Sequence, residues 1–141
     1  MATVNSTTYA AQLDAKVSLA QGIANATLHC ISTTYEASAA ASGTIINLFR
    51  LPKGAVVKNF DVAFDDLGTS VTLDIGDEGD GDRYVDGLDV ATAAGSKTGC
   101  LVDGVDYVIG TDASHDDALV TATVGGDAAT GTIKVTCYYA M

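Results

Sequence analysis

The residues best suited to chemistry form an acidic, glycine-rich stretch that ends at Arg83. Its carboxylates are Asp74, Asp77, Glu78, Asp80 and Asp82. Calcium takes six to eight oxygen ligands, and glycines let a loop wrap around the ion. The EF-hand spacing is not met: counting from Glu78 puts Arg83 where that motif needs glycine, and counting from Asp77 puts glycines at ligand positions. We expect an acidic, solvated turn in which Arg83 neutralises one carboxylate, with an irregular calcium site as the alternative.

Two short runs hold the residue types of nucleophilic catalysis. Ser114-His115-Asp116 has the composition of a hydrolase triad, but adjacent residues cannot aim at one another as a triad requires. His29 and Cys30 are neighbours in an expected strand and point to opposite faces. No glycine pattern of a phosphate-binding loop occurs. The sequence therefore predicts a protein that is not an enzyme, with no catalytic, cofactor-binding or metal-binding residues.

The charge balance restricts the partners. There are 18 acidic and 7 basic residues, for a formal net charge of −11. Phosphate contacts need clustered Lys and Arg, and anionic membranes attract basic segments, so we expect neither a nucleic acid nor a membrane as partner. The N-terminus lacks the basic and apolar regions of a secretory signal. A protein made in a cytoplasm is expected.

Cysteines and tyrosines offer two further candidates. Cys30, Cys100 and Cys137 show no CxxC spacing, so neither a zinc site nor a disulfide framework is predicted, and buried reduced thiols are expected. Exposed tyrosine is common in proteins that bind sugars or peptides. We interpret the tyrosines as packing and interface residues and keep carbohydrate binding as an alternative; they are Tyr9, Tyr35, Tyr84, Tyr107, Tyr138 and Tyr139.

The elements that would position these residues are strands. Alternation is clearest over 69–76, where Val71, Leu73 and Ile75 face one side. Segment 36–43 is expected to be a small-residue connection, and 91–98 a flexible crest. Other strands are expected over 28–35, 44–51, 55–64, around 83–85, once or twice within 99–110, and over 118–124 and 131–139. This pattern predicts an all-β fold, an antiparallel β-sandwich or jelly roll of about eight strands.

The first residues differ from the rest. Residues 1–27 are small, polar and weakly patterned, and we interpret them as an extended N-terminal arm before a β-sandwich domain at 28–141. An isolated arm of this kind frays, whereas an arm that lies on a neighbouring subunit finds backbone partners there.

A series of short motifs marks the middle of the chain. A strand ends in Arg50-Leu51-Pro52, a turn follows at Gly54, and an apolar strand covers Val56 to Phe64. Two further motifs complete the series, Thr72-Leu73-Asp74-Ile75-Gly76 and Asp82-Arg83-Tyr84. In these motifs the chain resembles the head decoration or capsid cement proteins of tailed bacteriophages.

The resemblance implies a structural virion protein. Such a protein is a sandwich or jelly-roll subunit, a homotrimer, that binds across junctions of the major capsid protein on the capsid exterior. It stabilises the shell by interface burial, and many copies add through avidity. Two alternatives stay open: a phage tail-fibre or head-fibre module that binds host surface glycans, and an unrelated β-sandwich binding module. Fibre shafts usually show repeats, which this sequence lacks.

Overall fold

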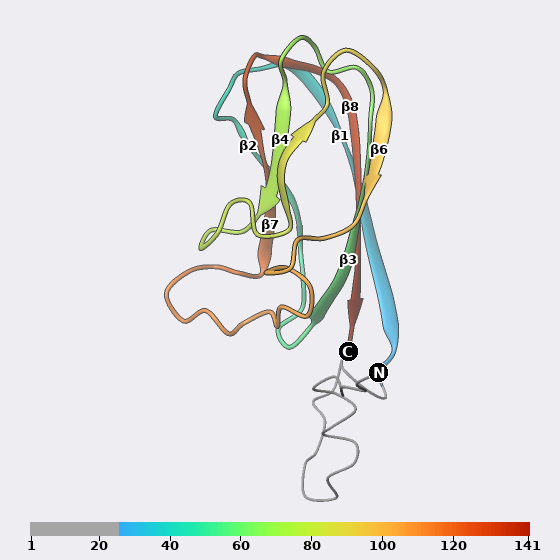
Figure 1. Ribbon diagram of the computed structural model, residues 1–141. Helices are drawn as coiled ribbons and strands as arrows, with labels where there is room; N and C mark the ends of the chain where they lie inside the picture. The colour runs from blue at the N-terminus through green and yellow to red at the C-terminus, as the bar shows by residue number, and fades with distance from the viewer. Residues whose placement is uncertain (1–25) are drawn as a thin grey trace, which may run out of the picture.

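The computed structural model describes residues 26–141, in which all regular elements are β-strands. Two antiparallel sheets of four strands face each other (Figure 1). The predicted all-β sandwich of about eight strands is confirmed. The described part of the chain has no helix that could cross a membrane. The strands are β1 (Leu28–Ala40), β2 (Ile45–Arg50), β3 (Val56–Phe64), β4 (Thr72–Gly76), β5 (Val85–Asp89), β6 (Gly95–Thr98), β7 (Leu119–Gly125) and β8 (Ala129–Ala140).

The strand order is that of a jelly roll. One sheet has the order β1-β8-β3-β6 and the other β2-β7-β4-β5. The antiparallel pairs β1·β8, β2·β7, β3·β6 and β4·β5 are successive sections of one long hairpin ribbon. Rolling this ribbon brings β8 beside β3 and β7 beside β4, which completes each sheet. The topology therefore selects the jelly roll from the two architectures that the sequence predicted.

The core lies between the sheets and follows the predicted alternation. On β4, Leu73 and Ile75 are buried while Thr72 and Asp74 are half-buried. β7 repeats this pattern with buried Val120, Ala122 and Val124, and β8 contributes Ile133, Val135 and Cys137. An aromatic stack of Phe60 on Tyr84, with ring centroids 4.6 Å apart, fills the end of the core near the longest loops. Period-two patterning thus places one face of each strand inward.

Three predicted segments are wrong. The expected connection at 36–43 is largely strand, because β8 supplies a ladder partner for Glu36 and Ala37. The expected crest at 91–98 contains β6, which pairs with the end of β3. The strands expected within 99–110 are a loop with a single isolated bridge, between Val56 and Val108. The short strand expected around 83–85 begins at Val85 and continues to Asp89.

The predicted arm lies outside the described residues except for its last two. Thr27 exchanges two backbone hydrogen bonds with Met141, of 2.9 and 3.1 Å, so the ladder between β1 and β8 continues one residue beyond β1. The described chain therefore begins and ends at the same corner of the sandwich (Figure 1).

Candidate functional site

The two longest connections meet at one end of the sandwich, which we call the loop end. It consists of residues 77–84, between β4 and β5, and residues 99–118, between β6 and β7. The Asp116 amide donates to Glu78 Oε2 at 2.7 Å, and the Leu101 amide donates to the carbonyl of Tyr84 at 2.9 Å. Figure 1 shows both connections projecting on the same side, next to β7. Residues far apart in sequence therefore form one surface.

A buried ion pair fixes the shorter loop. Arg83 donates to both carboxylate oxygens of Asp77, from Nε at 2.6 Å and from Nη2 at 3.2 Å, and the two side chains are 13% and 0% exposed. Asp77 Oδ1 also accepts the amides of Gly79 and Asp80. Burial acts to lower the pKa of Arg83, but the hydrogen bond and charge of Asp77 outweigh it and raise that pKa. The buried carboxylate of Asp77 therefore has protein donors at both of its oxygens.

The longer loop is built around a second buried carboxylate. Asp117 accepts the amides of Gly110, Thr111 and Asp112 at 2.9 to 3.1 Å and the hydroxyl of Tyr107 at 2.9 Å. Burial acts to raise the pKa of Asp117, but these donors outweigh it and hold the pKa below its ordinary value. Asp117 is therefore an anion at neutral pH and gathers the backbone of 110–112 around itself.

Arg83 joins the two carboxylate centres. Its guanidinium lies 4.0 Å from the ring centroid of Tyr107, in a cation–π contact, while the Tyr107 hydroxyl bonds to Asp117. Asp77, Arg83, Tyr107 and Asp117 form a continuous chain of contacts across the loop end. The contacts fix the relative position of two loops that contain little regular structure.

The long loop is also attached to the sheet. The Ile109 amide donates to Ala55, and Val57 and Tyr107 are joined by a backbone bond of 2.9 Å. Lys58 lies at a register shift of β3 and pairs with Asp106 at 2.5 Å. Gly104 lies so close to Tyr84 that a Cβ there would approach its ring to 2.6 Å. Only glycine allows this close approach.

An apolar turn projects from this scaffold. Leu101, Val102 and Val105 form it, and the amides of Gly104 and Val105 both donate to the Leu101 carbonyl. Val102 is 90% exposed, and Leu101 and Val105 are also exposed. Most loops expose polar side chains, so apolar residues exposed on a rigid turn indicate a contact surface. The sequence placed these residues in strands, so their exposure was missed; the clue was an apolar run without a steady alternation.

The acidic stretch does not form the solvated turn that was predicted. Asp77 is buried, and Asp74 accepts the Gly87 amide at 2.6 Å, although Glu78 and Asp82 are exposed. The expectation that Arg83 neutralises one carboxylate is confirmed, with Asp77 as the partner. Within residues 26–141, no three His, Cys, Asp or Glu side chains form a group that could hold a metal ion. The carboxylate oxygens instead accept bonds from protein donors.

The triad residue types are not brought together. His115 Nδ1 lies 3.0 Å from Asp112, not from Ser114, and Asp116 forms a bidentate pair with Arg50 at 2.9 and 3.0 Å. His29 lies in a strand as predicted, on β1, and stacks on Tyr139, whereas His115 lies in a loop. The structure therefore provides no nucleophile with an adjacent base in these two runs.

The predictions for the cysteines and tyrosines are confirmed only in part. All three cysteines are free thiols; Cys137 is buried as expected, Cys100 is half-buried, and Cys30 is exposed, so that prediction is wrong for Cys30. Burial raises the pKa of Cys137 to about 12 and that of Cys100 to about 11. Tyr84 is fully buried, and the remaining tyrosines within 26–141 are half-buried. Packing accounts for Tyr84, while Tyr9 lies outside the described residues.

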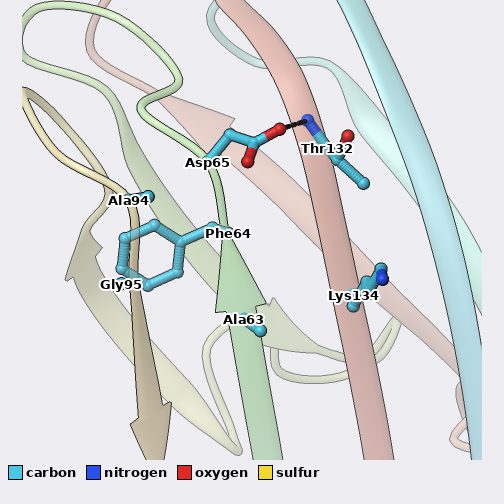
Figure 2. A pocket seen from close by; sticks show the side chains of 7 residues that line it. All are labelled: Ala63, Phe64, Asp65, Ala94, Gly95, Thr132 and Lys134. Atoms are coloured by element: carbon cyan, nitrogen blue, oxygen red, sulfur yellow. Dashed lines mark hydrogen bonds between the residues drawn. The ribbon is translucent and has the colours of Figure 1, made fainter.

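Two grooves lie on the outer faces of the sheets. One, of about 460 Å³, is lined by Phe64, Asp65, Lys134 and neighbouring small residues, and the Phe64 ring lies against Gly95 (Figure 2). The carboxylate of Asp65 in this groove accepts the Thr132 amide (Figure 2). The other groove, of about 520 Å³, lies between Ile45 and the acidic loop. Because Asp77, Glu78 and Asp116 of the two long loops line the second groove, that groove opens beside the loop end, which we take as the candidate site.

Two solved structures share this fold. A chain in the capsid asymmetric unit of cyanophage Pam1 superposes with a TM-score of 0.63 and 21% identity, over 91% of this chain and 96% of that chain. A chain in the capsid of Ralstonia phage GP4 gives a TM-score of 0.59 and 22% identity, over 84% and 85%. No family and no curated protein matches the sequence. At these identities the likeness establishes a common jelly-roll fold.

Proposed function

We propose that this chain is a structural virion protein of a phage that decorates the outer surface of the capsid and stabilises it. The observation that carries this proposal is the shared fold over most of the chain with chains found in two phage capsids. The partner is the major capsid protein, bound across the junctions between its copies. The middle motifs of the sequence, which resemble those of capsid cement proteins, support the same role.

The loop end is the surface that we assign to the shell. The apolar turn is anchored to Tyr84 by the Leu101 amide, which donates to the Tyr84 carbonyl, and by the close approach of Gly104 to the Tyr84 ring, so little conformational entropy should be lost on binding. Residues 99–118 contain five Asp and no Lys or Arg. A partner surface that combines apolar and basic residues would complement this loop. Repeated over many copies, even a modest contact of this kind holds tightly through avidity.

Two finer features remain predictions. The trimer implied by the resemblance is tested by sedimentation of the purified protein. The arm at residues 1–27 is tested by deleting residues 2–25, which we expect to leave the sandwich folded and to weaken shell binding. Loss of the fold on deletion would contradict the interpretation of this segment as an arm.

Co-sedimentation with assembled shells tests the proposed function. Purified protein is mixed with shells that lack it and pelleted, and the bound fraction is measured against protein alone. Saturable binding in proportion to the number of capsid subunits is expected. Protein that stays in the supernatant at all concentrations would refute the proposal.

The glycan-binding alternative finds no support at two of the tyrosines. Tyr84 is buried beneath Phe60, and the ring of Tyr107 is covered by Arg83, so neither ring is free to stack on a sugar. Binding to host-cell polysaccharide with no binding to shells would favour a fibre module.

A further inference from the structure

A second binding surface lies on the outer face of the sheet β1-β8-β3-β6, in the groove beside Phe64, which we call the Phe64 groove. Its volume of about 460 Å³ is within the usual range for small-molecule sites, about 300–1,000 Å³. Small residues, Ala63 on β3 and Gly95 on β6, leave room for it in the sheet surface (Figure 2). The larger side chains that border it are those of Phe64, Asp65, Thr132 and Lys134.

The Phe64 ring is the apolar wall of the groove and is held in place. Phe64 and Gly95 are cross-strand partners between β3 and β6. A Cβ on Gly95 would lie 3.1 Å from ring atom Cζ, so the ring rests on bare backbone that a larger residue would crowd. Phe64 is only half-buried and borders the groove with its remaining surface. A fixed aromatic surface of this kind can pack against the apolar face of a ligand at little cost in side-chain entropy.

The charged groups of the groove are one acceptor and one donor. Asp65 accepts the Thr132 amide with Oδ2 at 3.1 Å, and within residues 26–141 no protein donor bonds to its Oδ1. Lys134 lies beside Ala63 in the register of β3 and β8, is exposed, and forms no ion pair in the described part of the chain. An ionised carboxylate only accepts hydrogen bonds and an ammonium group only donates them.

This pair of groups favours a neutral polyol. The two charges of the groove balance, although the whole chain carries a net charge of −11. An anion would be repelled by Asp65 and a cation by Lys134, so neither is complementary to the lining. A hydroxyl group both donates and accepts, so neighbouring hydroxyls of one ligand can serve both side chains. A pyranose sugar combines such hydroxyls with an apolar ring face that the Phe64 ring can cover.

We propose that the Phe64 groove binds a neutral hexopyranose unit of a polysaccharide. Phe64 packs on the apolar face of the sugar, Asp65 accepts a hydrogen bond from one hydroxyl, and Lys134 donates to a neighbouring hydroxyl. A single sugar unit has only about twelve non-hydrogen atoms, so we expect a Kd on the order of 1–10 mM. All residues of the site belong to one copy of the chain, so the site requires no particular oligomeric state.

The groove and the loop end lie at opposite ends of β3. The Asp106 amide of the loop end donates to the carbonyl of Val57, near the start of β3, whereas Phe64 is the last residue of that strand. Seven residues of extended chain span about 24 Å. With the loop end on the shell, the groove would remain open to a polysaccharide outside the capsid. This orientation, but not the site itself, rests on the proposed function. Many copies on one capsid would multiply a weak contact through avidity.

An NMR titration of the isotope-labelled full chain tests the site. The probes are D-glucose, D-galactose and N-acetyl-D-glucosamine, and glycerol and inorganic phosphate are control ligands. At least one sugar should saturate the protein, and the amides that shift should be those around 63–65, 94–95 and 132–134. Glycerol has hydroxyls but no ring face, and phosphate is an anion, so neither should saturate at concentrations up to about 100 mM.

Two substitutions test the ring and the donor separately. Phe64→Leu keeps an apolar cover over Gly95 but removes the flat ring, and Lys134→Ala removes the ammonium group. Each should weaken sugar binding at least about fivefold. Lys53→Ala is the matched control, because Lys53 is an exposed lysine in the turn before β3, and it should leave binding unchanged. Thermal unfolding checks the fold of each variant, and the exposed Lys134 provides a test even where Phe64→Leu is unstable.

Three outcomes would overturn the proposal. The first is that none of the three sugars saturates the protein. The second is that the shifted amides lie outside the groove. The third is that Lys134→Ala binds sugar as tightly as Lys53→Ala does. Co-sedimentation with shells is judged separately: a chain that pellets with shells but binds no sugar refutes this site alone, and a chain that binds sugar but no shell refutes the proposed function alone.

Discussion

The sheet β1-β8-β3-β6 and the loop end are held by different forces. In the sheet, backbone ladders and one apolar face of each strand determine the shape, and most polar side chains lie in solvent. In the loop end, two buried carboxylates, Asp77 and Asp117, gather backbone amides, and Arg83 joins them. Buried and fully paired charges thus take the place of strand pairing in holding the two long loops together.

The largest expected effect comes from breaking the buried pair. Arg83→Ala leaves the Asp77 carboxylate buried without its partner and should lower the free energy of unfolding by about 3–5 kcal/mol. Arg50→Ala is the matched control, because Arg50 also forms a bidentate pair but is 61% exposed with a 42% exposed partner. It should cost at most about 1 kcal/mol. Urea denaturation measures both, and equal losses would contradict the distinction between the two pairs.

A substitution in the core tests whether the core and the loop end contribute independently to stability. Leu73→Ala in β4 removes a fully buried side chain and should cost about 2–5 kcal/mol through lost burial and a cavity. Because Leu73 is remote from the carboxylate network, its effect should add to that of Arg83→Ala in the double variant. If the loss of unfolding free energy in the double variant, measured by urea denaturation, differs strongly from the sum of the two single losses, the core and the loop end are energetically coupled.

Acid should act on the loop end through Asp117. The folded-state pKa of this group lies below its ordinary value of 3.8. Its contribution to the stability of the fold is therefore complete above that value and is lost as the pH falls through the folded-state pKa. Asp117→Asn places an amide group among backbone donors and should cost about 1–3 kcal/mol at pH 7. It should also flatten the loss of stability below pH 4 in thermal unfolding. If the variant loses stability below pH 4 as steeply as the wild type does, then Asp117 does not contribute to the acid sensitivity of the fold.

The smallest effect on stability is expected at the apolar turn. Val102→Ser changes a side chain that is 90% exposed and should alter the free energy of unfolding by less than about 0.5 kcal/mol. Shell binding should nevertheless weaken severalfold, whereas Ile45→Ser, an exposed apolar residue on β2, should leave it unchanged. Equal binding by both variants in co-sedimentation would move the contact surface away from the loop end.

The sheets could be predicted from the sequence, but most of the loop end could not. Alternation located the strands at 44–51, 55–64, 118–124 and 131–139, because each buries one face. The extension of β1 beyond Tyr35 depends on its partner β8, which local propensity does not reveal. Within the loop end only the role of Arg83 was foreseen, since it stands among acids. The burial of Asp117 could not be predicted from the sequence, because its donors include backbone amides that only folding brings together.

A reconstruction of the purified virion, with copy numbers from mass spectrometry, tests the central claim most directly. We expect the protein on the outer capsid surface, in numbers comparable to those of the major capsid protein, with the loop end facing the shell. A virion that lacks the protein, or that holds it in a few copies on fibres or tail, would refute a role as a decoration protein.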